Sequence, residues 1–366
     1  MKTFVILLGA ILFSAALTAG GGLDAVACAE DAEAGDRGAS LGKFQSSEIH
    51  MGVDFTIVLY APDQEAANRA FRAAFERIEQ LNKVMSDYDP QSELSRLSDA
   101  SPTKRPIPIS DDLLRVLHQA NAWSEKTDGA FDVTVGPLVR LWRRARRRGE
   151  LPSRDRLDDA LASVGYRHLR LDAQQKTAEM LRSDMLLDLG GIAKGYAVDE
   201  ALETLRGLGL RRALVNGSGD LAAGDPPPDK SAWSVGVAPL DAGGKPSLLL
   251  RLANQAVATS GDAFQYVEID GRRYSHIVDP RTGLGLSDHS SVTIVAPNCM
   301  TADALASSVS VLGPEKGIAL VERTAEAAAL IVRAPEGTVE THRSKRFKAI
   351  PHSIPRSEDG AVDGGR

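Results

Sequence analysis

Residues 188–196 read Asp-Leu-Gly-Gly-Ile-Ala-Lys-Gly-Tyr and mark the point where a strand-rich stretch turns into a helix. That helix is predicted to run from Ile192 to Leu208 and to end at Gly209, a residue type that commonly closes helices. Two glycines ahead of a helix expose backbone amides at its positive end, and Lys194 adds a charge, which together suit an anionic phosphate. The spacing matches neither a P-loop nor a dinucleotide fingerprint, so a glycine turn with a solvated lysine is an equally good interpretation.

Strands and helices are predicted on both sides of this segment without a strict order. Helices are predicted at residues 65–84, 110–123, 153–164, 192–208, 301–311 and 314–323. Strands are predicted at residues 50–60, 169–187 as a hairpin, 212–215, 233–237, 248–252, 256–259, 274–277, 291–296, 330–332 and 346–350. Because these elements do not form a βαβ repeat, the sequence predicts an α+β fold, with mixed sheets and packed helices, rather than a doubly wound sheet.

The composition excludes several classes of protein. The 366 residues are 43% hydrophobic and 25% charged, with a net charge of -6 and two cysteines. This balance is too apolar for a disordered chain, and the excess of acid argues against a nucleic-acid-coating protein. Two cysteines exclude a disulfide framework and a Cys-rich zinc site. The basic run 143–148 lacks interleaved aromatic residues and is predicted to be a solvated helix face.

The N-terminus, residues 1–27, has the features of an export signal. Lys2 precedes a long apolar run, and Ala25-Val26-Ala27 form a small-x-small cleavage site. Cys28 follows directly, so attachment of the mature chain to a membrane through an acylated Cys28 and simple cleavage are alternatives. Either route places the mature protein outside the cytoplasm, in a periplasm or on a membrane surface.

Both ends of the mature chain are expected to lie outside the domain. Residues 28–44 are rich in Ala, Gly and acidic residues and are predicted to be a tether. Residues 351–366 are polar and are predicted to be a disordered tail. The folded domain is therefore predicted to occupy residues 45–350.

Residues 301–307 open a predicted helix with Thr-Ala-Asp-Ala-Leu-Ala-Ser. Asp303 and Ser307 lie one turn apart on one helix face, so both oxygens can reach one hard cation. One carboxylate, one hydroxyl and backbone carbonyls suit Mg²⁺, which keeps waters and phosphate oxygens in its shell. A helix-capping role for Asp303 is the alternative.

Residues 274–283 combine an imidazole, a carboxylate and a guanidinium where a predicted strand ends in a turn. His276 is a candidate general base, and Asp279 is a candidate to orient it or a neighbouring strand. A purely structural histidine is the alternative.

Taken together and in this order, these segments resemble the ApbE family of FAD:protein FMN transferases. The resemblance also includes His50-Met51-Gly52 and residues 85–94, 129–138 and 258–262. It covers about residues 45–349. Each motif is modest alone, but seven in sequence order are specific.

The resemblance implies an α+β fold related to the T-fold and a transferase that cleaves FAD at its pyrophosphate. FMN would pass to a Thr or Ser hydroxyl of a partner protein through a phosphoester bond, with release of AMP. The partner would carry a Ser/Thr-Gly-Ala-Thr-like motif. Because this chain has no such motif, the acceptor is expected to be another protein.

Site residues are carried over position by position. The family's flavin-contacting positions fall on Met51, Tyr88, Ala130, Phe131, Asp132, Asp188, Lys194 and Ile277. Its Mg²⁺ ligands fall on Asp303, Ser307 and the main-chain carbonyl of Gly191, and His276 matches its transfer-associated histidine. Ser307 stands where Thr is frequent, which keeps the oxygen ligand, and residues 216–220 replace a more usual Gly-Gly-Asp.

Two other functions use the same residues. An FAD pyrophosphatase would replace the acceptor hydroxyl by water, and a flavin-binding lipoprotein would carry FAD without chemistry. The combination of Lys194, His276, Asp303 and Ser307 favours an enzyme. Transfer and hydrolysis need the same Mg²⁺ and phosphate contacts, so the sequence leaves both open.

Overall fold

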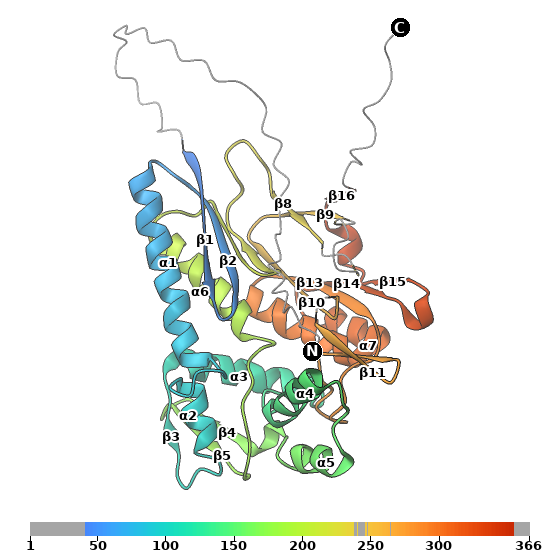
Figure 1. Cartoon of the computed structure of the whole chain (residues 1–366). Coiled ribbons are helices and arrows are strands. Elements are labelled where there is room, and N and C mark those ends of the chain that lie inside the picture. The colour runs from blue at the N-terminus through green and yellow to red at the C-terminus, as the bar shows by residue number, and fades with distance from the viewer. Residues whose placement is uncertain (1–40, 238–239, 241–245, 247, 264, 355–366) are drawn as a thin grey trace, which may run out of the picture.

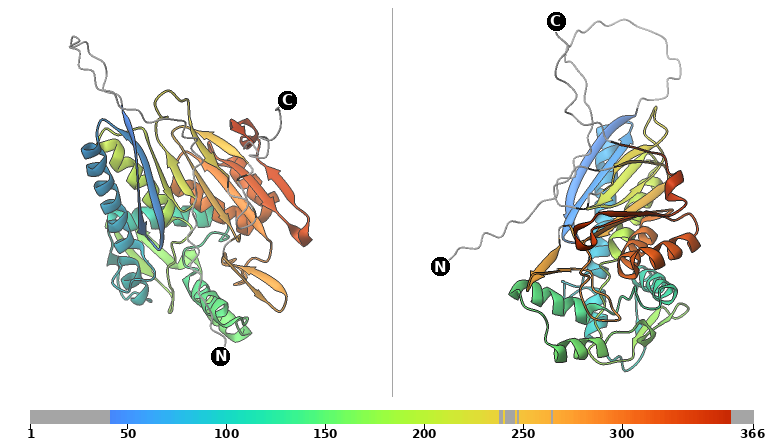
Figure 2. Two further views of the ribbon diagram at one scale, coloured as in Figure 1. Left: turned by 45° about the horizontal axis from the view of Figure 1, so that its top comes forward. Right: turned by 90° about the vertical axis from the view of Figure 1, so that its right-hand side faces the viewer.

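The computed structural model describes residues 41–237, 240, 246, 248–263 and 265–354, and its centre is an eight-stranded antiparallel sheet (Figure 1). In spatial order the strands are β1 (Gly42–His50), β2 (Val53–Ala61), β6 (Ala213–Gly217), β7 (Asp220–Ala223), β10 (Gln255–Gly261), β13 (Ser290–Ala296), β14 (Ala328–Arg333) and β15 (Glu340–Arg343). Figure 2 shows these strands side by side, from blue β1 to red β15. The predicted α+β class is confirmed.

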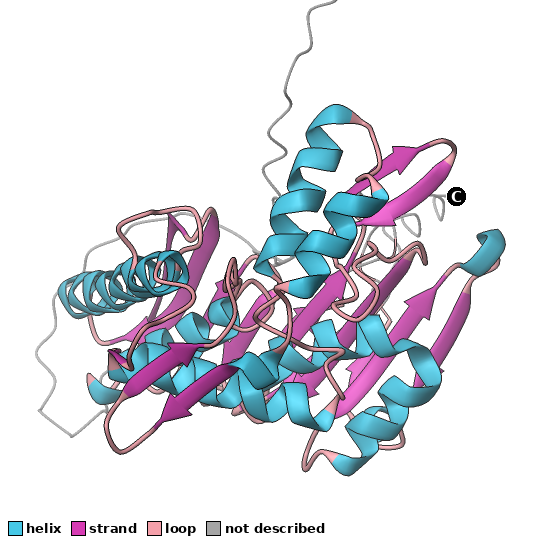
Figure 3. Cartoon of the chain, turned by 90° about the horizontal axis from the view of Figure 1, so that it is seen from below, coloured by secondary structure: helices cyan, strands magenta, loops and turns pink. Residues whose placement is uncertain are grey.

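Three long helices cover one face of this sheet: α1 (Gln64–Met85), α6 (Ala193–Gly207) and α7 (Cys299–Arg323) (Figure 3). The apolar residues of α1 recur at helical spacing, so Phe71, Ile78 and Leu81 enter the core together. Asp63 caps this helix by accepting from the Ala66 amide at 2.7 Å. Periodicity and cap together explain why the sequence predicts this helix well.

A small sheet covers the other face. It contains β8 (Trp233–Gly236), β9 (Leu249–Leu252) and β16 (His352–Ser353). Apolar residues that alternate along β13 therefore enter two cores: Val292 and Ile294 pack toward the helices, and Val295 packs toward the small sheet. All seven residues of β13 are buried because both of its faces are covered.

A second region lies at one end of the large sheet (Figure 1). It contains α2 (Glu93–Asp99), α3 (Asp111–Lys126), α4 (Gly136–Arg148), α5 (Arg154–Ala162), the sheet β3 (Ile107–Pro108)–β5 (Thr177–Met180)–β4 (Leu169–Asp172), and the hairpin β11 (Tyr266–Ile269)–β12 (Arg272–Ser275). Trp142 of α4 packs on Tyr274 of this hairpin, and its indole Nε1 donates to the Gly283 carbonyl at 2.7 Å. This contact joins α4 to the segment that carries His276.

The N-terminal boundary differs from the prediction. The strand predicted at 50–60 is the second half of a hairpin, and the first strand begins at Gly42. The tether predicted at 28–44 is therefore too long by its last three residues, because an edge strand with one exposed face lacks a strong apolar pattern. Met51 and Gly52 form the hairpin turn, with φ of 51° and 75°. The predicted export signal and Cys28 lie outside the described residues.

The C-terminal boundary also differs. The strand predicted at 346–350 is instead a short 3₁₀ helix, Phe347–Ala349, whose Phe347 is buried under the small sheet. The tail predicted from residue 351 begins later, because His352 and Ser353 pair with β9. Residues 355–366 lie outside the described part.

The helices predicted at 301–311 and 314–323 are confirmed as two segments of α7, which are separated by a kink at Gly313 with φ 75°. By length and composition α7 could cross a membrane. It packs instead against α6, β10 and β13, as the core helix of this domain.

Candidate active site

The glycine loop of residues 188–191 leads into α6 as the sequence predicts. Asp188 folds the loop back, because its Oδ1 accepts from the Gly190 amide at 2.8 Å. Ile192 precedes the first helical residue and supplies no side-chain cap. The cap comes instead from Asp303 of α7, which accepts from the Gly195 amide at 3.1 Å, while the Ala193 amide donates to the Leu189 carbonyl at 2.8 Å.

Lys194, in the first turn of α6, is held by two buried carboxylates. Its Nζ lies 2.6 Å from Asp220 Oδ2 and 3.8 Å from Asp303 Oδ2, and the Gly195 amide donates to the same Asp303 oxygen at 3.1 Å. Burial acts to lower the pKa of Lys194, but the charges of Asp220 and Asp303 outweigh it, so the pKa is raised. Lys194 is thus a fixed cation at neutral pH.

Asp303 is an acid that is buried away from water, where the charged form of a carboxylate is disfavoured. Burial, followed by the negative charge of Asp220, raises the pKa of Asp303 to about 7. Only 7% of the Asp303 side chain is exposed. A second cation beside this carboxylate would favour its charged form.

The three predicted metal ligands lie together. Asp303 and Ser307 are on α7, and a Cβ atom on Gly191 would lie only 2.8 Å from Ser307 Oγ. The same Cβ would lie 3.3 Å from the Phe131 ring, so only glycine fits at this position. A carboxylate, a hydroxyl and a carbonyl are hard oxygen donors that fit Mg²⁺. Within the described residues no group of three or more His, Cys, Asp or Glu side chains could hold a metal, so waters or substrate oxygens would have to complete its shell.

The Tyr88 ring and the Arg143 guanidinium form a stacked pair beside the glycine loop. Arg143 of α4 pairs with Asp87 at 2.6 Å and with Asp188 at 3.2 Å, and its guanidinium lies 4.3 Å from the centre of the Tyr88 ring. Burial raises the pKa of Asp188. Tyr88 is 76% exposed, so the ring offers a free face for stacking by another ring system.

The other predicted flavin-contacting residues are buried or partly buried and are held by contacts within the protein. Asp132 is buried and accepts from the Thr134 amide at 2.8 Å, the Thr134 hydroxyl at 2.7 Å and the Tyr166 amide at 2.8 Å. Ala130 and Phe131 are also buried, and Met51 is partly buried in the hairpin turn. Of these residues, Phe131 lies against the glycine loop, since its ring is 3.3 Å from where a Cβ on Gly191 would be.

His276 follows β12 and is held by one backbone carbonyl. Its Nδ1 lies 3.1 Å from the Gln265 oxygen, which also accepts from the His276 amide at 3.0 Å. A carbonyl can only accept, so Nδ1 carries the proton and Nε2 keeps its lone pair. Burial lowers the pKa of His276 to about 4, assisted by the positive charges of Arg146 and Lys194. The imidazole is therefore neutral at pH 7 and can act as a base.

Of the two roles predicted for Asp279, to orient His276 or a neighbouring strand, the first is not seen. Its carboxylate pairs with Arg281 at 2.9 and 2.8 Å, and its carbonyl accepts from the Gly283 amide. Asp279 fastens the turn that follows Ile277, whose amide donates to the Ser275 hydroxyl at 3.1 Å. Among the described residues, the Gln265 carbonyl is the group that orients His276.

Three residues at the site were missed or misjudged from the sequence. Asp220 was noted only as part of a divergent segment, although it is the main partner of Lys194. Arg143 and Arg146 belong to the run predicted to be solvated, yet both are partly buried at the site. Arg143 and Arg146 are three residues apart, which places them on one helix face. This spacing was the only feature of the sequence that could have distinguished them from the other arginines of the run.

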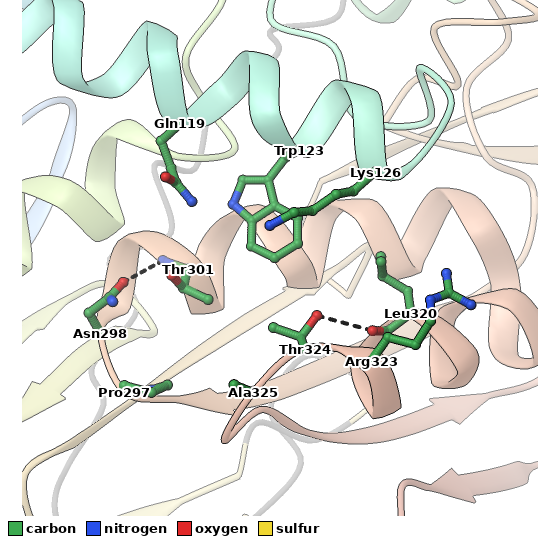
Figure 4. A pocket seen from close by; sticks show the side chains of 10 residues that line it. All are labelled: Gln119, Trp123, Lys126, Pro297, Asn298, Thr301, Leu320, Arg323, Thr324 and Ala325. Carbon is green, nitrogen blue, oxygen red and sulfur yellow. Dashed lines mark hydrogen bonds between the residues drawn. The ribbon is translucent and has the colours of Figure 1, made fainter.

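A separate hollow of about 420 Å³ lies between α3 and α7 (Figure 4). It is lined by Gln119, Trp123, Lys126, Pro297, Asn298, Thr301, Leu320, Arg323, Thr324 and Ala325. None of the predicted site residues is among these, so the hollow is distinct from the cluster around Lys194.

Comparison with known proteins gives consistent results. The model of the ApbE family matches residues 51–331. A "FAD:protein FMN transferase" of Haemophilus influenzae is 34% identical over 280 residues, which is 75% of this chain and 81% of that protein. A protein of the same name from Vibrio cholerae is 32% identical over 309 residues, covering 81% of this chain and 90% of the relative.

Solved structures agree with these relatives. The "Flavin Transferase ApbE from Vibrio cholerae" has a TM-score of 0.75 and 29% identity, covering 85% of this chain and 100% of that one. The Pseudomonas stutzeri flavinyl transferase ApbE, in its apo form, has a TM-score of 0.75 and 31% identity, covering 85% and 97%. The family match includes the large sheet from β2 into β14, the glycine loop and the segment of His276, and the chain belongs to the ApbE family.

Proposed function

We propose that this chain transfers FMN from FAD to a Thr or Ser hydroxyl of a partner protein, in a reaction that depends on Mg²⁺ and releases AMP. The names of the relatives support flavin transfer. The observation that carries the proposal is the cluster of the oxygen donors Asp303 and Ser307 with Gly191 beside the fixed charge of Lys194, whose field also acts on the neutral His276.

Flavin binding would use the carried-over positions. The exposed face of Tyr88 would stack on a ring of FAD, and the walls formed by Met51, Ala130, Phe131 and Ile277 would enclose it. The charged residues Asp132 and Asp188 would act mainly by holding the surrounding loops.

Mg²⁺ would be held by the Asp303 carboxylate, the Ser307 hydroxyl and the Gly191 carbonyl. When bound, it would neutralise negative charge on the pyrophosphate. Lys194 would supply further positive charge, and Asp220 and Asp303 hold its ammonium group in place.

The proposed chemistry is a displacement at phosphorus. The acceptor oxygen forms a bond to the phosphorus on the flavin side, and the bond from that phosphorus to the bridging oxygen breaks, so the oxygen leaves with AMP. His276 Nε2 takes the proton of the acceptor hydroxyl. The product is a phosphoester between FMN and the partner protein.

The cellular setting is proposed from the N-terminal sequence. Lys2, the apolar run and Ala25-Val26-Ala27 support export, and Cys28 supports attachment to a membrane as a lipoprotein. The acceptor would be a periplasmic or membrane protein with a Ser/Thr-Gly-Ala-Thr-like motif.

The test is incubation of the exported part of the chain with FAD, Mg²⁺ and a peptide that carries the motif. A peptide that gains the mass of FMN, with one AMP released for each, is the expected result. FMN and AMP without a labelled peptide would identify a pyrophosphatase. Bound FAD with no AMP would identify a flavin-binding protein.

A further inference from the structure

The arginines of α4 fall into two groups. Arg143 and Arg146 are partly buried, whereas Arg140, Arg144, Arg147 and Arg148 are exposed. Arg143 stacks on Tyr88, and the charge of Arg146 acts both on the Tyr88 hydroxyl and on His276. Arg146 lies one helical turn after Trp142, which packs on Tyr274 just before His276, and three residues after Arg143, so it is on the face of α4 that meets both the Tyr88 pair and the His276 segment.

The cationic side chains Arg143, Lys194 and Arg146 differ in whether a carboxylate pairs with them. Arg143 has the carboxylates of Asp87 and Asp188, and Lys194 has those of Asp220 and Asp303. Arg146 has neither an ion pair nor a side-chain hydrogen bond within the part of the chain that the structure describes.

The surroundings of Arg146 make this lack of a partner costly. Burial lowers the pKa of its guanidinium, and the charges of Arg143 and Arg147 act in the same direction. A partly buried charge without a counterion reduces stability. Such a charge is expected where an anionic ligand supplies the missing partner.

We propose that Arg146 binds the pyrophosphate of FAD, an inference that rests on the proposed function. The pyrophosphate is the anionic part of FAD and joins its ring system to the phosphorus that reacts. A ring on Tyr88 and an acceptor hydroxyl at His276 would place it next to Arg146. The planar guanidinium can donate two hydrogen bonds to phosphate oxygens, and it would stabilise charge on the phosphoryl group during transfer.

The experiment compares Arg146→Gln and Arg146→Lys with Arg147→Gln, the exposed neighbour on the same helix. Dissociation constants are measured by calorimetry for FAD, for ADP, which carries the adenosine and the pyrophosphate without the flavin, and for riboflavin, which carries no phosphate. Arg146→Gln should weaken FAD and ADP binding by about 10- to 100-fold, the scale of a lost hydrogen bond to a charged group. Riboflavin binding should stay within about twofold, Arg146→Lys should recover part of the loss, and Arg147→Gln should behave as wild type.

Three results would overturn the assignment. They are unchanged FAD affinity in Arg146→Gln, an equal loss of riboflavin affinity, and a raised KM for the acceptor peptide alone. Thermal unfolding of each variant separates a binding effect from a loss of fold, and the Lys variant keeps the comparison usable if the Gln variant unfolds. A wild-type protein that binds FAD but labels no peptide would contradict the proposed function, while the affinity comparison would still decide the role of Arg146.

Discussion

At the scale of single residues, the site depends on charges that the fold has fixed in place. Lys194 cannot swing freely, because Asp220 and Asp303 hold its ammonium group on two sides. His276 is fixed in one tautomer by a carbonyl rather than by a carboxylate. Motif analysis could find His276, Lys194 and Asp303 because their side chains carry the signal. It could not find the Gln265 carbonyl, because any residue type supplies one.

Replacement of Asp303 tests the metal ligands. Asp303→Ala should lower Mg²⁺-dependent AMP release by more than about 100-fold, because the one carboxylate among the proposed ligands is lost. Asp303→Asn keeps an oxygen that can accept from the Gly195 amide, so it serves as the control for local structure. AMP release is measured over a range of Mg²⁺ concentrations. Unchanged release in both variants would remove Asp303 from the site.

Replacement of His276 tests the proposed base. His276→Ala should lower FMN transfer by about 10²–10⁴-fold, the usual effect of losing a general base, while FAD affinity changes far less. Flavin fluorescence of the gel-resolved acceptor and FAD titration report the two quantities. A parallel loss of FAD affinity would mean that His276 holds the substrate.

The pH dependence of transfer follows from the same residue. Because the pKa of His276 is lowered to about 4, the imidazole stays unprotonated at neutral pH and becomes protonated only as the pH falls toward that value. Its contribution to the rate should therefore be flat from about pH 6 to pH 8 and should be lost in more acidic solution. A loss of rate centred near 6.5, the ordinary pKa of histidine, that His276→Ala abolishes would contradict this.

At the scale of elements, the site depends on how closely α6 and α7 approach. A Cβ atom on Gly195 would lie 2.4 Å from the Cys299 carbonyl oxygen and 2.9 Å from Asp303 Cβ. Helix periodicity predicted both helices, but it could not predict which face of α6 meets α7. Helix periodicity has the same limit for α4. It could not predict that Arg143 and Arg146 are partly buried while the neighbouring arginines on this helix are exposed.

Gly195→Ala tests this contact. The added methyl group meets backbone of α7, so the variant should lose about 1–3 kcal/mol of unfolding free energy and should displace Asp303 from Lys194. Gly207→Ala is the matched control, since Gly207 is at the other end of α6 and a Cβ there would meet no atom within 4 Å. Denaturant unfolding measures both. Equal stability of the two variants would show that α6 can shift without cost.

At the scale of the whole molecule, the large sheet lies between the layer of α1, α6 and α7 and the small sheet, and α6 and α7 carry Lys194 and Asp303. The central strands were predictable because β13, for example, is rich in β-branched residues and is buried on both faces. The boundaries were not, because β1 alternates partly exposed and exposed residues and β16 is only two residues long. These two strands are defined by their pairing, β1 with β2 and β16 with β9. The local sequence does not encode this pairing.

Removal of the N-terminal export signal is a prediction to be tested on the full chain. The mature protein is expected to begin at Cys28 or shortly after it, because the export signal is removed. Mass spectrometry of protein from a native membrane fraction measures this, and a diacylglyceryl mass on Cys28 would decide in favour of lipidation. An intact Met1 would contradict the prediction.

Within the described residues the eight-stranded sheet is open, so β1 and β15 each leave one row of backbone groups without a neighbouring strand there. Such edges can pair between molecules and start aggregation. β15 is four residues long and includes Glu340 and Arg343, and Lys43 and Glu48 of β1 are both exposed, on opposite faces of the strand. These charges make a second copy a poor partner at either edge. The protein can therefore keep an open sheet without polymerising through it.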